Sequence, residues 1–262
     1  MKRLFGIACA LIFLAACTNI NGAGKNDNGG TLKRDSVTDS MRINLNGHEI
    51  SSTVKIVVPV GNEALNKSIR HFLVESVEGD DNLNSLQSMA HHFVALKTNE
   101  LKEDVFCDGT QDFCPPLSFD MEIGVIYENE KIVTLCTIQD IYLGGAHGSY
   151  LYGGTTFRKS DGVILDDGIL KKSKIGEVKK EVSRRLAEEY FKRDNDEDSP
   201  MMENGVLKTV DLPGAGVYID NDSMVFTYQQ YEIAAYVFGL PTVSIPLKEM
   251  KEKGWLNDNA NW

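Results

Sequence analysis

Apolar residues recur at helical spacing in three segments of the chain. Residues 62–77 place apolar side chains every three or four positions, with Asn62 as a candidate N-cap and Gly79 as the stop. The same period runs through residues 83–101 and residues 174–192. The pattern therefore predicts three amphipathic helices, each with one face packed against another element.

Between these helices, short runs of β-branched and apolar residues are separated by turn residues. Such runs predict strands at residues 53–59, 117–127, 131–142, 150–158, 163–165, 217–219, 224–228 and 243–245. The segments Glu128-Asn129-Glu130 and Asp220-Asn221-Asp222 are the expected turns of two hairpins. Helices gathered around antiparallel hairpins predict an α+β fold in which about three helices pack on the sheet.

The start of the chain has the pattern of an export signal. Lys2 and Arg3 precede an apolar stretch, residues 4–16, that is shorter than the roughly 20 residues needed to cross a bilayer. The following Leu14-Ala15-Ala16-Cys17 resembles the bacterial lipobox, which implies a signal peptide at residues 1–16 and lipidation, including palmitate, at Cys17. The alternative is an ordinary signal peptide with an incidental cysteine. Several acyl chains on one cysteine would hold the protein stably at a membrane.

Residues 17–41 are expected to form a flexible, lipid-anchored tether. This stretch is rich in Asn, Gly, Asp, Ser and Thr, so it offers little apolar surface to offset the entropy of ordering. The folded body is expected to start near Arg42. Thr18 follows the lipobox cysteine in place of the aspartate that resembles an inner-membrane retention signal. We therefore expect a lipid-anchored protein of the cell envelope or periplasm, at the outer membrane where the cell has one.

The composition is that of a globular protein with an acidic surface. The chain has 262 residues, of which 42% are hydrophobic and 25% charged, and these values exclude global disorder and a polytopic membrane protein. The formal net charge is −11, and loss of Lys2 and Arg3 with the signal would make it −13. Such a charge repels nucleic acid. It either keeps the protein soluble or steers a cationic protein partner toward it.

Three cysteines remain in the folded body of a protein exported to an oxidising compartment. Cys107 and Cys114 flank a short loop, and a disulfide between them would stabilise the fold by about 2.5 kcal/mol in the chain-entropy model. Cys136 lies in an apolar run and is expected to be a buried, inert thiol. No histidine or further cysteine lies nearby at ligand spacing, so we expect no metal site and no cofactor.

An unusual glycine-rich stretch follows the predicted strand 131–142. It reads Gly144-Gly145-Ala146-His147-Gly148 and is echoed by Gly153-Gly154. As a functional feature, it would offer His147 as a base or ligand beside backbone N–H groups. As a structural feature, the glycines would build a tight crossing that His147 caps by hydrogen bonding. Both interpretations stay open, although lone histidines seldom catalyse.

Three segments together resemble the RsiV-like extracytoplasmic domain: residues 144–148, Asp161-Gly162 before an apolar strand, and residues 226–246. Ala235 departs from the family pattern, in which proline is expected. The family includes the lysozyme-sensing region of an anti-sigma factor and noncatalytic parts of some peptidoglycan deacetylases. Residues 54–77 resemble the smaller domain that commonly precedes it. The resemblance implies a companion α+β domain at 42–140, an RsiV-like domain at 141–253 and a tail at 254–262.

The resemblance implies binding and carries over no activity. We expect a noncatalytic lipoprotein that binds a cell-wall glycan such as peptidoglycan, or a cationic protein such as lysozyme. The candidate ligand-binding residues are Gly144, Gly145, His147, Tyr150, Tyr152, Tyr228, Tyr231 and Glu232. For the tyrosines, a place in the core is the competing interpretation. The rival function is a hydrolase of an envelope ester or glycan with His147 as its base.

Overall fold

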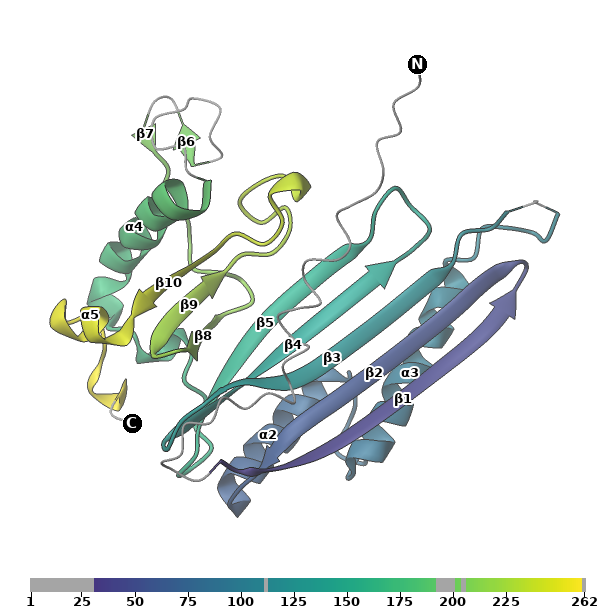
Figure 1. The fold of residues 1–262 in the computed structure, drawn as a ribbon, viewed down its shortest axis with the longest axis horizontal. Coiled ribbons are helices and arrows are strands. Elements are labelled where there is room, and N and C mark those ends of the chain that lie inside the picture. The colour runs from purple at the N-terminus through teal and green to yellow at the C-terminus, as the bar shows by residue number, and fades with distance from the viewer. Residues whose placement is uncertain (1–30, 111–112, 192–200, 204–205, 261–262) are drawn as a thin grey trace.

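The computed structural model describes residues 31–110, 113–191, 201–203 and 206–260 (Figure 1). A five-stranded sheet carries two helices on one face, and a smaller C-terminal part is built on a three-stranded sheet. The predicted α+β class is confirmed. Cys17, the expected signal peptide and the first part of the expected tether lie outside the described residues. Within the described part, no helix has the length and apolar character needed to span a membrane.

The large sheet has the strand order β1-β2-β3-β4-β5. Its strands are β1 (Lys33–Leu45), β2 (His48–Val60), β3 (Leu117–Glu128), β4 (Ile132–Tyr142) and β5 (Ser149–Arg158). Neighbours pair antiparallel except β2 and β3, which are parallel, with Val54 opposite Met121. The expectation of hairpins alone was therefore incomplete. Parallel strands need a long crossover. Two helices between β2 and β3, α2 (Glu63–Ser76) and α3 (Leu86–Glu103), supply it.

Helices α2 (Glu63–Ser76) and α3 (Leu86–Glu103) cover one face of the large sheet. The Asn62 side chain caps α2 by accepting a hydrogen bond from Leu65 N, as predicted, and Ser85 forms a capping box with Ser88 at the start of α3. The apolar stripes of both helices pack on the sheet in one core. Its members include Val54, Ile56, Leu65, Ile69, Phe93, Val94, Met121 and Ile123.

Strand β1 corrects the expected start of the folded body. The chain is already a strand at Lys33, so the region from there to residue 41 is not a flexible tether in this structure. Asn46 and Gly47 have φ values of 53° and 87° and form the two-residue turn that joins β1 to β2. Asn-Gly is the preferred sequence for such turns. This dipeptide was the signal in the sequence that would have revealed the hairpin.

The C-terminal part has a core of its own. Helix α4 (Ile175–Arg185) continues as a π-helical turn (Leu186–Phe191). The remaining elements are β6 (Met202–Glu203), β7 (Val206–Leu207), β8 (Val217–Asp220), β9 (Ser223–Thr227), β10 (Thr242–Pro246) and α5 (Leu247–Glu252). Buried side chains between α4 and the β10-β9-β8 sheet include Val178, Val182, Leu186, Ile219, Phe226 and Ile245. The expected strand at 163–165 is only an isolated bridge between Phe157 and Ile164.

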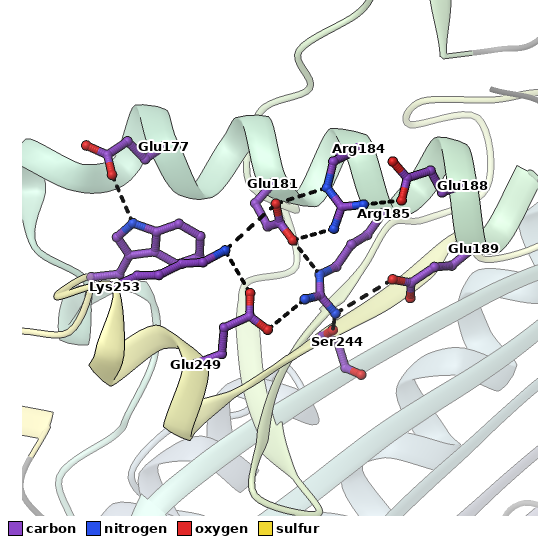
Figure 2. A network of polar contacts seen from close by, with 10 residues as sticks. Glu177, Glu181, Arg184, Arg185, Glu188, Glu189, Ser244, Glu249 and Lys253 are labelled. Carbon is purple, nitrogen blue, oxygen red and sulfur yellow. Dashed lines mark hydrogen bonds and ion pairs between the residues drawn. The ribbon is translucent and has the colours of Figure 1, made fainter. Parts of the chain in front are cut away.

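A network of charged side chains fastens α4 to β10 and α5 (Figure 2). Glu181 accepts hydrogen bonds from Arg184 at 2.6 Å and from Arg185 Nε at 2.9 Å. Arg185 also reaches Glu249 Oε2 at 2.8 Å and the carbonyl oxygen of Ser244 at 3.1 Å. The helix, the strand and the C-terminal turn are therefore joined by ion pairs on the outside of the C-terminal core.

Strand β8 joins the two parts by packing on β4 and β5. The Tyr218 ring lies over Gly154, where a Cβ atom would stand 2.2 Å from the Tyr218 Cγ atom. Thr134 Oγ1 donates to the carbonyl oxygen of Ile219 at 2.6 Å, and Ile219 N donates to Thr156 Oγ1 at 2.8 Å. Both threonines are fully buried. The contact combines apolar packing with satisfied polar groups, as a buried interface requires.

The sheet topology also moves the expected domain boundary. The division between residues 140 and 141 falls inside β4 and would separate β4 from β5, its neighbour in the same sheet. Breaking that ladder would expose a row of backbone polar groups. Strands β4 and β5, the latter ending at Arg158, therefore belong to one sheet.

Candidate binding surface

Two segments far apart in the sequence meet beyond one end of the large sheet. The turn between β4 and β5 brings His147 onto Tyr236, and their rings stack with centroids 3.8 Å apart and planes at 21°. The Tyr231 ring lies 6.0 Å from the Tyr236 ring. Tyr231 is 65% exposed and the neighbouring Val237 is 83% exposed. We call these four side chains, His147, Tyr231, Tyr236 and Val237, the loop surface.

Two glutamines hold the segment after β9 against β5. Gln229 Oε1 accepts a hydrogen bond from Tyr152 N at 3.1 Å, and Gln229 Nε2 donates to the carbonyl oxygen of Tyr152 at 2.8 Å. Gln230 Oε1 accepts from Tyr150 N at 3.0 Å. Because β5 is the edge strand of the large sheet, these side chains take the place of a further strand. Tyr150 and Tyr152 therefore enter the site through their backbones.

The sequence reasoning missed Gln229 and Gln230. They directly follow the predicted strand at 224–228, and adjacent amide side chains at that position were the available signal. An amide group carries both a donor and an acceptor, so it can pair with the free N–H and carbonyl groups of an open strand edge.

Two expected ligand-binding residues serve the structure of this segment instead. Tyr228 is only 1% exposed, and its hydroxyl donates to the carbonyl oxygen of Asp211 at 2.7 Å. Burial raises the pKa of Tyr228 well above its ordinary value. Glu232 accepts from Gly214 N at 2.8 Å and from Gln229 N at 2.7 Å. We do not count either side chain in the loop surface, because Tyr228 is enclosed and the Glu232 carboxylate joins its own loop to the loop before β8.

Tyr231 has an unusual backbone conformation. Its φ is +66°, a region that bulky side chains rarely occupy. The hydrogen bond from Glu232 N to the carbonyl oxygen of Gln229 at 3.1 Å closes the turn around it, and the Glu232 carboxylate holds Gln229 N. Strain of this kind persists where surrounding contacts enforce it, and it gathers at functional positions. Here it turns an aromatic ring toward solvent.

The glycine turn is packed against a neighbouring loop. Gly144 has a φ of 76°, and a Cβ atom there would lie 2.9 Å from Pro115 and 3.1 Å from Phe106. The Tyr142 hydroxyl donates to the carbonyl oxygen of Gly145 at 3.1 Å. Gly144 and Gly145 therefore shape the turn that presents His147, and they offer no side chain to a ligand.

The surroundings of His147 suit stacking more than proton transfer. The imidazole is exposed, and its Nδ1 atom lies 2.9 Å from the carbonyl oxygen of Gly148. In the described parts of the chain, no carboxylate makes a hydrogen bond or an ion pair with this ring. A hydrolytic triad needs such an acid to orient its histidine.

Acidic side chains lie on the sheet close to the loop surface. Asp120 and Asp140 stand directly opposite each other on β3 and β4, and Asp140 is also opposite Tyr150 on β5. Burial, followed by the like charge of Asp120, raises the pKa of Asp140. This paired charge creates a negative field at the same end of the molecule, which favours a cationic ligand.

The structure also joins the cysteines to a histidine that the sequence did not connect with them. Cys107 and Cys114 form a disulfide bond. The fully buried His48 lies beside it, and Cys107 N donates to His48 Nε2 at 3.2 Å. Ligand spacing in the sequence could not indicate this proximity, because 59 residues separate His48 from Cys107. Cys136 is fully buried in β4, away from this cluster.

Two hollows in the described part of the chain are lined by residues other than the exposed rings of the loop surface. A hollow of about 780 Å³ at the opposite end of the sheet is lined by residues that include Asn62, Lys131, Lys159 and Lys251. A smaller hollow of about 220 Å³ beside β5 is lined by residues that include Leu151, Tyr152 and Gln229. None of the four side chains of the loop surface lines either hollow, whereas small-molecule sites are typically concave.

Comparisons with known proteins agree with this architecture. Residues 167–248 match the family model described as "Protein of unknown function (DUF3298)". A solved DUF3298 family protein from Bacteroides fragilis is 20% identical, with a TM-score of 0.67, and one from Pseudomonas aeruginosa is 13% identical, with a TM-score of 0.60. Each alignment covers 88% of this chain and 96% of the other. No curated protein matches the sequence. Residues 167–248 of the chain are thus similar to the DUF3298 model, and the fold of the chain is similar to that of solved proteins that carry the same family name.

Proposed function

We propose that this chain is a noncatalytic binding lipoprotein of the cell envelope that contacts its ligand through the loop surface. The observation that carries the proposal is the stacked pair His147 and Tyr236, with the exposed Tyr231 beside it. Exposed aromatic rings that are held in place lose little entropy on binding and dominate many interfaces.

The ligand class follows from the chemistry of this surface. Aromatic rings stack on the apolar faces of sugar rings and also pack against side chains of a protein. The opposed Asp120 and Asp140 and the acidic net charge favour a cationic protein over an anionic one. The resemblance to the RsiV-like domain points the same way, so lysozyme and peptidoglycan are the first ligands to test.

The exit of the chain toward its proposed anchor supports this arrangement. Lys33 at the start of β1 pairs with Val60, whereas the β1–β2 turn at Asn46 and Gly47 is at the other end of the strands. Thirteen residues of β1 extend over about 43 Å at the rise of a strand. Leu117 and Tyr142 lie toward the end that carries the loop surface, so the binding residues are remote from the point where the tether leaves.

We expect substitutions of the loop surface to weaken binding while the protein stays folded. Tyr236→Ala should weaken binding to lysozyme or to peptidoglycan fragments by about 10- to 100-fold, because it removes the ring on which His147 stacks. Binding is detected by a pull-down, and the affinity is then measured by calorimetry with a soluble ligand. A matched pair adds a control: Val237→Ser should weaken binding, and Val163→Ser, at an exposed valine elsewhere, should leave it unchanged.

Two outcomes would contradict the proposal. A folded wild-type protein that binds neither peptidoglycan nor lysozyme would remove its ligand classes. Turnover of an ester or glycan substrate that is lost in His147→Ala, at unchanged thermal stability, would instead establish the rival hydrolase.

The anchor has a separate test. Metabolic labelling with a palmitate analogue should mark the wild-type protein, and Cys17→Ser should remove the label and release the protein from the membrane fraction, because no other cysteine follows a lipobox-like sequence. Cys9→Ser, within the expected signal peptide, is the control and should be labelled like the wild type. An unlabelled wild-type protein would contradict the anchor while leaving the binding surface untouched.

A further inference from the structure

The cluster of His48, Cys107 and Cys114 has the composition of a soft-metal site. One ligand atom from each residue lies within 4.8 Å of the other two. His48 and Cys107 are buried, and Cys114 is partly exposed, so the cluster is enclosed but reachable from one side. The cluster lies where the β1–β2 turn meets the loop before β3.

The imidazole of His48 is oriented in the way that metal-binding histidines are. Its Nδ1 atom lies 2.7 Å from the carbonyl oxygen of Pro115, which can only accept, so Nδ1 carries the proton. The Nε2 lone pair accepts a hydrogen bond from Cys107 N at 3.2 Å, and this bond has to open before Nε2 can bind an ion. In a metal-bound histidine, the ring nitrogen that does not bind the metal usually donates its N–H to a carbonyl or carboxylate, as Nδ1 does here. The Phe106 ring further fixes the imidazole by an edge contact at 4.6 Å.

The surrounding backbone also keeps the sulfur atoms in place. A Cβ atom on Gly47 would lie 3.2 Å from Cys114 Sγ, so the β1–β2 turn packs directly against this sulfur. His48 is the first residue of β2, and Cys107 lies in the loop before β3; both residues are buried. Opening the disulfide would therefore leave both thiols beside Nε2.

We propose that the reduced form of this cluster binds one monovalent copper ion through His48 Nε2 and the two cysteine sulfurs. A dithiol reductant opens the disulfide: it gives two electrons and two protons, the S–S bond breaks, two thiols form, and the dithiol becomes a disulfide. The ion then replaces the two thiol protons, which pass to solvent. Two thiolates and an imidazole are soft ligands that suit Cu(I), whereas zinc prefers a fourth ligand.

The test uses the full mature chain, reduced by a dithiol and separated from it without oxygen. Cu(I) is titrated in competition with bathocuproine disulfonate, whose colour reports the copper that the protein has not taken. The reduced protein should bind one equivalent. The oxidised protein, with the same sequence, should bind at least about 100-fold more weakly because its sulfurs are bonded to each other. Equal uptake by both forms would overturn the proposal.

A substitution isolates the role of the histidine. His48→Asn keeps an N–H near the Nδ1 position for the Pro115 carbonyl but removes Nε2, and it should weaken Cu(I) binding by about tenfold or more. Cys136→Ala, at a thiol outside the cluster, should bind like the wild type. If His48→Asn fails to fold by circular dichroism, Cys114→Ser with His48 intact tests the site through one of its sulfur ligands instead, and it should also weaken Cu(I) binding by about tenfold or more. Wild-type affinity in either variant, or tighter binding of Zn(II) than of Cu(I), would refute the site.

Discussion

Replacing Gly154 with alanine should lower the free energy of unfolding by about 2–3 kcal/mol, which is the range for forcing an extra methyl group into a packed core. The added Cβ would lie 2.2 to 2.6 Å from three atoms of the Tyr218 ring. Tyr218 is buried and cannot swing away without separating β8 from the large sheet. The measurement is urea unfolding of both proteins under identical conditions.

The neighbouring glycine supplies the control. An added Cβ at Gly153 meets no atom within 4 Å, so Gly153→Ala should change stability by less than about 0.5 kcal/mol. In a double-mutant cycle, Gly154→Ala should cost little once Tyr218→Ala has removed the ring. Equal losses for the two glycine variants would mean that β8 does not pack on the sheet as described.

The second large effect concerns the ion-pair network between α4 and α5. Glu181→Gln should lower the free energy of unfolding at pH 7 by about 1–3 kcal/mol. The substitution removes one carboxylate partner of Arg185, in a site where the side chains of Arg185 and Glu181 are each about 15% exposed. Glu188→Gln removes the Arg184 partner whose side chain is 41% exposed, and it should cost less than about 0.5 kcal/mol. A loss as large in Glu188→Gln as in Glu181→Gln would contradict this ranking.

The same network predicts a pH dependence with a defined sign. Hydrogen bonds from Arg184, opposed by some burial and aided by Arg185, lower the pKa of Glu181 from its ordinary 4.5 to about 2. A carboxyl group whose pKa is lower in the folded state stabilises it fully above the unfolded value, and this contribution is lost as the pH falls through the folded value. The contribution is at most about 3 kcal/mol and should disappear between pH 4.5 and pH 2. The stability difference between wild type and Glu181→Gln should therefore shrink from pH 7 to pH 3, and an unchanged difference would contradict the assignment.

Local patterns in the sequence were sufficient for most elements of secondary structure. The 3.6-residue period and the cap at Asn62 located α2, and the turn residues around Asn129 and Asn221 located two hairpins. These predictions succeed because capping, turn formation and amphipathic periodicity depend on residues within a few positions of one another. The missed strand β1 was also a local signal, the Asn46-Gly47 turn.

The candidate sites depended on contacts that no local pattern contains. Tyr152 and Gln229 are 77 residues apart, and His48 and Cys107 are 59 apart, yet each pair is joined by a hydrogen bond. Tyr228 and Tyr231 are three residues apart and were equal candidates, but one is buried and the other is exposed. Which residue faces solvent was decided by the packing of β9 and by the left-handed turn at Tyr231.

The sequence by itself determined the α+β class, the positions of the main helices and an acidic, cysteine-containing body, since these depend on composition and short-range periodicity. The tertiary structure alone decided the parallel pairing of β2 with β3, the extent of the large sheet through β5, and the meeting of His147 with Tyr236 and of His48 with the cysteines. Except for the β4–β5 hairpin, each of these requires closing a long loop, and the free energy that closes it comes from burial of the whole core and not from the residues that are brought together.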